Sequence, residues 1–160
     1  MAVTVNLRHL EARDVHLAGE VPVAELDIDT RDELVRLEKP LEYDLEVQKM
    51  EEGLLVQGRL RLELRCECAR CLKPFMHTVE LRRWSLLLAF QGEEAVPVVN
   101  DCVDLTPYMR EDILLEFPQH PLCDPECRGL PKKLIGKAKT NINQPDADAS
   151  AWAKLNKLKF

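Results

Sequence analysis

A strict alternation of apolar and polar residues constrains the fold of this chain more than any other feature. Apolar side chains recur at every second position in 41–47 and again, after the short connection "EEG", in 54–64, where Gly58 alone interrupts the row. A period of two residues is that of a strand with one buried face. Two such strands joined by a short glycine-bearing turn predict a β-hairpin. One face of this hairpin is expected to pack on a core.

The other face of the predicted hairpin carries charge, with an acidic strand beside a basic one. Arginines of the second strand (Arg59, Arg61, Arg65) are one candidate for a nucleic-acid-binding stripe. The first strand offers carboxylates that can pair with them across the strands (Glu42, Asp44, Glu46). We expect cross-strand pairing in preference to phosphate binding.

Weaker patterns predict the remaining elements. Residues 3–7 alternate as a short opening strand, and 76–90 form the pattern of a third long strand. Its apolar–polar alternation slips by one residue near Arg82 and Arg83, which indicates a bulge or the end of the strand. "TRDELVRLEK" is compatible with a short helix capped by Thr30, and "LTPYMREDILLEFP" with a helix capped by Thr106. "DASAWAKLNKLKF" ends the chain as an amphipathic pattern.

Together these patterns predict an α+β protein with a curved, barrel-like antiparallel sheet, one helix near 107–117 and a C-terminal helix. We expect residues 1–130 to form a single α+β domain that carries the cysteines. Residues 131–160 are expected to be a basic linker followed by the C-terminal amphipathic helix.

Charge is unevenly distributed along the 160 residues, whose formal net charge is −6. Residues 128–160 hold eight Lys/Arg against two acids, whereas residues 1–127 hold 14 bases and 26 acids. An acidic body with a basic tail can place the tail on a polyanion, or the tail can associate with the body itself. No apolar run is long enough to cross a bilayer and the N-terminus does not resemble a signal peptide. We therefore expect a cytoplasmic protein with reduced thiols.

Six cysteines include three in the hexapeptide "CECARC", residues 66–71. A disulfide, a metal site, a redox centre and core packing can each account for such a cluster. Cys68-Ala-Arg-Cys71 has the spacing with which a tight turn directs two thiolates at one zinc ion, and Cys123 and Cys127 form a second pair. We predict that these four hold Zn²⁺, and that Cys66 and Cys102 belong to the core.

Catalytic motifs are absent from the sequence, so we predict a protein that is not an enzyme. A thioredoxin-like centre requires the Cys-x-x-Cys motif between a strand and a helix, whereas strands are expected on both sides of it here. There is no glycine-rich phosphate loop, no H-E-x-x-H and no nucleophile elbow.

Several motifs follow one another in a recognisable order: "CARCLKPF", an acidic loop, "VDLTPYMREDILLEFPQHPLC", "CRGL" and a Trp-containing end. This order resembles the bacterial YceD family, the large ribosomal RNA subunit accumulation proteins. The resemblance implies a role in accumulation or processing of large-subunit rRNA, possible metal and nucleic-acid binding, and no assigned enzymatic activity. It also implies Cys68, Cys71, Cys123 and Cys127 as the metal ligands. Many members carry further cysteines after the "GL". This chain has none beyond Cys127, which excludes a second metal centre of that kind.

We therefore predict a ribosome biogenesis factor that supports 23S rRNA accumulation or processing by binding the rRNA or a pre-ribosomal particle. No membrane and no small-molecule substrate are expected as partners. The predicted contacts with RNA or a ribosomal protein are Arg128, Lys132, Lys133, Lys137 and Lys139. The alternative is an adaptor whose acidic body holds a basic ribosomal or RNA-processing protein without touching RNA. Phosphate binding weakens steeply with salt, which separates the two.

Overall fold

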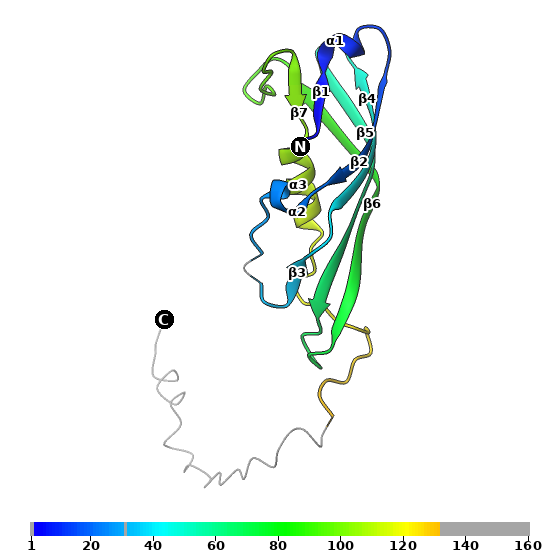
Figure 1. The fold of residues 1–160 in the computed structure, drawn as a ribbon, viewed down its shortest axis with the longest axis vertical. Coiled ribbons are helices and arrows are strands. Elements are labelled where there is room, and N and C mark those ends of the chain that lie inside the picture. The colour runs from blue at the N-terminus through cyan, green and yellow to red at the C-terminus, as the bar shows by residue number, and fades with distance from the viewer. Residues whose placement is uncertain (1, 31, 132–160) are drawn as a thin grey trace, which may run out of the picture. The chain divides into compact units, whose positions relative to one another are not determined.

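A computed structural model describes residues 2–30 and 32–131 of the chain (Figure 1). The chain divides into two compact units, residues 1–129 and 130–160, and the first holds nearly all of the described residues. The predicted C-terminal helix lies outside the described residues, as do Lys132, Lys133, Lys137 and Lys139.

A long antiparallel hairpin forms the centre of the sheet, as the alternation predicts. Strand β4 (Leu41–Lys49) pairs with β5 (Gly53–Glu67), and the register runs from Glu42 opposite Arg61 to Lys49 opposite Leu54. Strand β6 (Pro74–Ala89) pairs with β5 along almost its whole length. The third predicted strand is thereby confirmed.

Two shorter strands complete this sheet. Strand β2 (Val15–Val21) pairs with β4, and β3 (Val35–Leu37) pairs with the end of β5 beyond the reach of β4. The short helix expected in "TRDELVRLEK" is wrong, because the structure places β3 there. Val35 lies opposite Cys66 and is buried, so pairing with the exposed edge of β5 outweighs the local helix signal.

A β-bulge interrupts the pairing of β5 with β6. Gly58 pairs with Trp84 and Leu60 with Leu81, so the single residue Arg59 faces two residues of β6, Arg82 and Arg83. The bulge lies where the alternation of the sequence slips, so of the two predicted alternatives, a bulge or a strand end, the structure confirms the bulge. Gly58 is required beside it, because a Cβ there would lie 2.1 Å from the backbone oxygen of Asp44.

In the described part of the chain, a smaller sheet and three helices accompany the large sheet. Strands β1 (Thr4–Asn6) and β7 (Cys102–Asp104) pair with each other, while α1 (Leu7–Leu10) and α2 (Val23–Leu26) are single turns. Helix α3 (Thr106–Leu115) occupies the predicted segment. Its N-cap is Leu105 rather than Thr106. The Thr106 hydroxyl instead accepts a hydrogen bond from the backbone N–H of Val3 at 2.8 Å, which ties the start of the chain to the helix.

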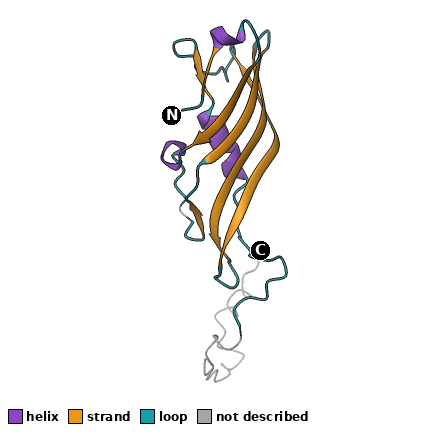
Figure 2. Cartoon of the chain, turned by 45° about the vertical axis from the view of Figure 1, so that its right-hand side comes forward, coloured by secondary structure: helices purple, strands orange, loops and turns teal. Residues whose placement is uncertain are grey.

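The sheet is curled, and α3 packs against its apolar face (Figure 2). Most inward residues of β4 and β5 are buried, with Leu45, Leu60 and Leu64 at 0% exposure, whereas Tyr43 is only partly buried. On α3, Met109 and Ile113 are buried, and Asp112 accepts a 2.6 Å hydrogen bond from the indole N–H of Trp84 in β6. The predicted curved antiparallel sheet with a helix near 107–117 is confirmed.

Charged residues on the outward face of the hairpin form ion pairs, but only Arg61 pairs with one of the predicted carboxylates, Glu42. Arg61 lies 3.5 Å from Glu42, and Arg59 lies 2.7 Å from Glu80. Arg65 pairs with Glu38 of the segment after β3 at 3.4 Å. The arginines of β5 are therefore engaged mainly with carboxylates of this domain. Among the described residues, no helix has the length and apolar character needed to span a membrane.

Candidate metal centre

Two loops bring the predicted cysteine pairs together at one end of the large sheet. The first loop connects β5 to β6 and carries Cys68 and Cys71. It closes through hydrogen bonds from Cys68 N–H to the Lys73 carbonyl and from Leu72 N–H to the Cys68 carbonyl, each 2.9 Å long. Leu72 has a left-handed backbone (φ 60°), which lets the chain reverse into β6.

The second loop follows α3 and carries Cys123 and Cys127. Cys127 N–H donates to the Asp124 carbonyl, and the Asp124 carboxylate accepts from Glu126 N–H at 2.8 Å, so the turn is held by its own acidic residue. The two loops are joined directly. Ala69 N–H donates to the Pro121 carbonyl at 2.8 Å, and the guanidinium of Arg70 donates to the Cys127 carbonyl at 2.9 Å.

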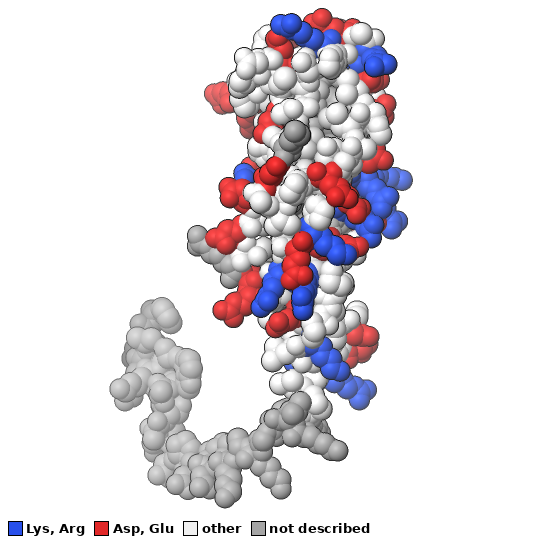
Figure 3. Space-filling model, in the orientation of Figure 1, with Lys and Arg blue, Asp and Glu red and all other residues white. Residues whose placement is uncertain are grey.

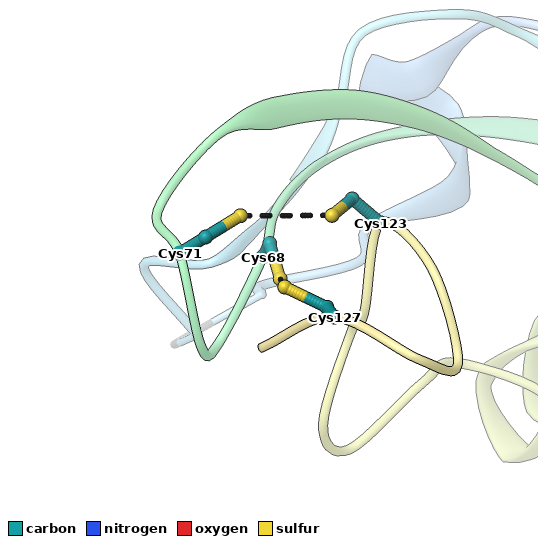
Figure 4. A group of neighbouring side chains, drawn as sticks. All are labelled: Cys68, Cys71, Cys123 and Cys127. Carbon is teal, nitrogen blue, oxygen red and sulfur yellow. Dashed lines mark hydrogen bonds between the residues drawn. The ribbon is translucent and has the colours of Figure 1, made fainter. Parts of the chain in front are cut away.

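The four sulfur atoms converge between the loops (Figure 4). All four lie within 4.8 Å of one another. The Sγ–Sγ distance is 3.8 Å from Cys68 to Cys127 and 3.6 Å from Cys71 to Cys123. Each of these contacts joins one loop to the other, although 51 residues separate Cys71 from Cys123 in the sequence.

These distances fit a tetrahedral zinc site. Zinc binds thiolate sulfur at about 2.3 Å, so neighbouring sulfurs of a regular tetrahedron lie about 3.8 Å apart. A disulfide needs a sulfur–sulfur distance of about 2.05 Å. All six cysteines of the chain are free thiols. The donor set and its spacing therefore suit a metal ion better than a covalent pair.

The electrostatics of the cluster point the same way. Hydrogen bonding from the backbone of Cys123, and then from Cys71 and Arg70, lowers the pKa of the Cys68 thiol to about 6 despite its burial. Hydrogen bonding to Cys71 raises the pKa of Cys123 to about 12. The backbone amide of Gly129 lowers the pKa of Cys127, but burial and the neighbouring thiols Cys71 and Cys68 give a net increase. Without a cation the cluster thus favours ionisation of Cys68, and a divalent ion would displace the remaining protons.

The other two cysteines lie elsewhere. Cys66 is the last inward residue of the β5 row and is fully buried in the core, as predicted, and burial raises the pKa of its thiol. Cys102 in β7 is only half-buried, because its neighbour Val103 takes the inward position of that short strand. The expectation of a core position for Cys102 is therefore wrong.

Arg128 is the one predicted RNA or partner contact within the described residues. It directly follows Cys127 and is exposed. Sequence reasoning did not identify Arg70 as a functional residue. Its position inside the Cys-x-x-Cys turn was visible, but its bond to the second loop depends on a contact across 57 residues of sequence.

The family described as "Large ribosomal RNA subunit accumulation protein YceD" matches residues 56–159. An uncharacterized protein of Mycobacterium tuberculosis (strain ATCC 25618 / H37Rv) is 31% identical over 124 residues, which cover 72% of this chain and 60% of the relative. An uncharacterized protein of Mycobacterium leprae (strain TN) is 31% identical over 137 residues, covering 79% of this chain and 63% of the relative.

The chain spans less than two thirds of the length of these curated relatives. No solved structure matches it. The family match begins inside β5 and takes in both cysteine loops and α3, the elements from which the sulfur cluster is built. The chain belongs to the YceD family of large ribosomal RNA subunit accumulation proteins.

Proposed function

We propose that this protein supports the accumulation of large-subunit (23S) rRNA by binding the rRNA or a pre-ribosomal particle, and that Zn²⁺ held by Cys68, Cys71, Cys123 and Cys127 fixes its binding end. The rRNA role follows from family membership. The observation that carries the metal is the convergence of four free thiols from two loops within 4.8 Å.

Zinc in this setting is a structural ion. With four thiolate ligands the coordination shell is closed and leaves no position for a substrate or an activated water. Its contribution is to hold the β5–β6 loop against the segment that follows α3. We therefore assign the protein no enzymatic step. Its activity is binding, and the cysteine loops determine where the basic end of the chain leaves the domain.

The basic residues after the second loop are our candidates for contact with phosphates. Arg128 leads this group, and Lys132, Lys133, Lys137 and Lys139 follow it in the sequence. We propose residues 1–130 as the domain that carries the metal and residues 131–160 as the segment that reaches the RNA or a ribosomal protein. A row of cations can neutralise several phosphates and release their counterions, which makes such binding strongly salt-dependent.

Filter binding of the full chain to a transcript of bacterial large-subunit rRNA tests this function. We expect binding that weakens steeply with salt, and a loss when the four lysines are changed to glutamine. A matched control changes four acids or amides of the same segment without removing cations. No binding at any salt concentration would contradict direct RNA contact.

An adaptor without RNA contact is the second candidate, and the charge of the domain favours it. Residues 1–127 carry 12 more acids than bases, and several arginines of the sheet are already paired with carboxylates. Such a surface suits a basic ribosomal or RNA-processing protein. Co-purification of a basic protein from cells, together with no affinity for naked rRNA, would select this function over the first.

A further inference from the structure

The bulge between β5 and β6 gathers three arginines on one surface. Arg59 is the single β5 residue between Gly58 and Leu60, and it faces both Arg82 and Arg83. On β6 the inward residues before the bulge are Val79 and Leu81, whereas after it they are Trp84 and Leu88. The inward-facing residues of β6 therefore have odd numbers up to position 81 and even numbers from position 84 onward. This change leaves both Arg82 and Arg83 on the outward face, beside Arg59.

This arginine cluster (Arg59, Arg82, Arg83) has more positive charge than its neighbours neutralise. Glu80 accepts from Arg82 at 2.8 Å and lies 2.7 Å from Arg59, so one carboxylate serves two guanidinium groups. Asp44 is the β4 partner of Arg59, but its carboxylate is engaged with His16 at 2.6 Å. Among the described residues Arg83 forms no ion pair. Figure 3 shows a group of basic side chains on one side of the domain, in the region of these strands.

Folding does not account for this arrangement. Like charges on neighbouring strands repel, and a bulge needs no cationic side chains at its two extra positions. Arg82 is 81% exposed and Arg59 is 54% exposed, so their heads are accessible to a ligand. Glu80 is much less exposed, at 20%, and lies among the arginines as their shared partner.

We propose that Arg59, Arg82 and Arg83 form a phosphate-binding surface on the sheet, at which the domain itself contacts the RNA backbone. The planar guanidinium group matches the geometry of a phosphate and can bind it through two parallel hydrogen bonds. Three such groups at one bulge suit neighbouring phosphates of one strand. This inference rests on the proposed function in RNA binding, and it adds a contact site separate from the basic residues that follow Cys127.

The charge-removing variant is R82Q/R83Q, which keeps the Arg59–Glu80 pair intact. With the full chain and the same large-subunit rRNA transcript, the slope of log affinity against log salt should become shallower by about 1.5. The matched control R8Q/R13Q removes two charges near α1, at Arg8, which pairs with Asp101, and at Arg13. This control should leave the slope close to that of the wild type.

A second variant changes binding in the opposite direction. Glu80→Gln removes the carboxylate that neutralises Arg59 and Arg82, so RNA affinity should increase severalfold at low salt. Far-ultraviolet circular dichroism verifies that each variant is folded.

Three outcomes would each overturn this inference while leaving the proposed RNA binding intact. They are an unchanged salt slope in R82Q/R83Q, a salt slope reduced as much in the control R8Q/R13Q, and an unchanged RNA affinity in E80Q. Loss of a co-purifying acidic protein in R82Q/R83Q, with RNA affinity unchanged, would assign the surface to a protein partner instead and also overturn it. A wild-type protein that does not bind the transcript would contradict direct RNA contact, the part of the proposed function on which this inference rests.

Discussion

Removal of the metal should destabilise the domain by an amount that can be worked out from the positions of its ligands. The four cysteines connect two loops, and 51 residues separate Cys71 from Cys123. A crosslink that closes a loop of this length lowers the conformational entropy of the unfolded chain. In the chain-entropy treatment this raises the free energy of the unfolded state by about 4 kcal/mol at 25 °C. We take this value as the upper limit for the contribution of zinc. Without the ion the loops keep their direct hydrogen bonds, which still oppose their separation.

Cys123→Ser is the sharpest perturbation because Cys123 is the exposed member of the cluster, so its replacement leaves no cavity in the core. We expect one zinc per chain in the wild type by mass spectrometry and none in the variant. The midpoint of thermal unfolding should fall by about 10 °C, given the scaling for a domain of this size. Cys102→Ser is the matched control, because Cys102 lies outside the cluster. This variant should keep both its zinc and its stability.

Removal of the ion by a chelator tests the same link without a substitution. Treatment with a strong chelator should lower the stability of the wild type to that of Cys123→Ser and should not affect the variant. Equal stability of wild-type protein with and without metal would refute the view that zinc ties the two loops. Full zinc content in Cys123→Ser would refute the assignment of the ligands.

Three further predictions concern the sheet. Trp84→Phe should lower the free energy of unfolding by about 2 kcal/mol in urea titrations, because Asp112 loses its indole partner; Asp112→Asn, which keeps an acceptor, should cost less. Gly58→Ala should destabilise the protein by more than about 2 kcal/mol, because the new Cβ would clash with the backbone of β4. Gly19→Ala should destabilise it less, because the nearest atom there is the movable hydroxyl of Tyr43. Equal losses of unfolding free energy for the two variants in calorimetry would contradict the requirement for glycine beside the bulge. Hydrogen bonding from Arg82, followed by the charge of Arg59, holds the pKa of Glu80 below 4.5. The stabilisation from Glu80 should therefore be full above pH 4.5 and be lost as the pH falls through its folded pKa, so the difference in unfolding free energy between wild type and Glu80→Gln should shrink on acidification. A constant difference down to pH 2 would refute it.

Local patterns in the sequence determined the long elements of this protein. The alternation in 41–64 predicted the hairpin, and the slip of the alternation at Arg82 and Arg83 predicted either a bulge or a strand end at the position where the bulge lies. Thr106 and Pro107 marked the start of a helix to within one residue. The two cysteine pairs were recognisable by their spacing alone. All of these signals lie within a few residues of each other, and side-chain direction along one strand or helix follows directly from such spacing.

Tertiary structure decided the features that depend on distant parts of the chain. The three residues of β3 carry too little pattern to identify a strand, and only the edge of β5 that β4 does not reach fixes them as one. The convergence of the two cysteine pairs required β5, β6 and α3 to place two loops together across 51 residues. The neighbours of Arg59, Arg82 and Glu80 likewise follow from strand register. Spacing determines which face a residue occupies, but only the packed fold determines which residues from elsewhere in the chain meet it there.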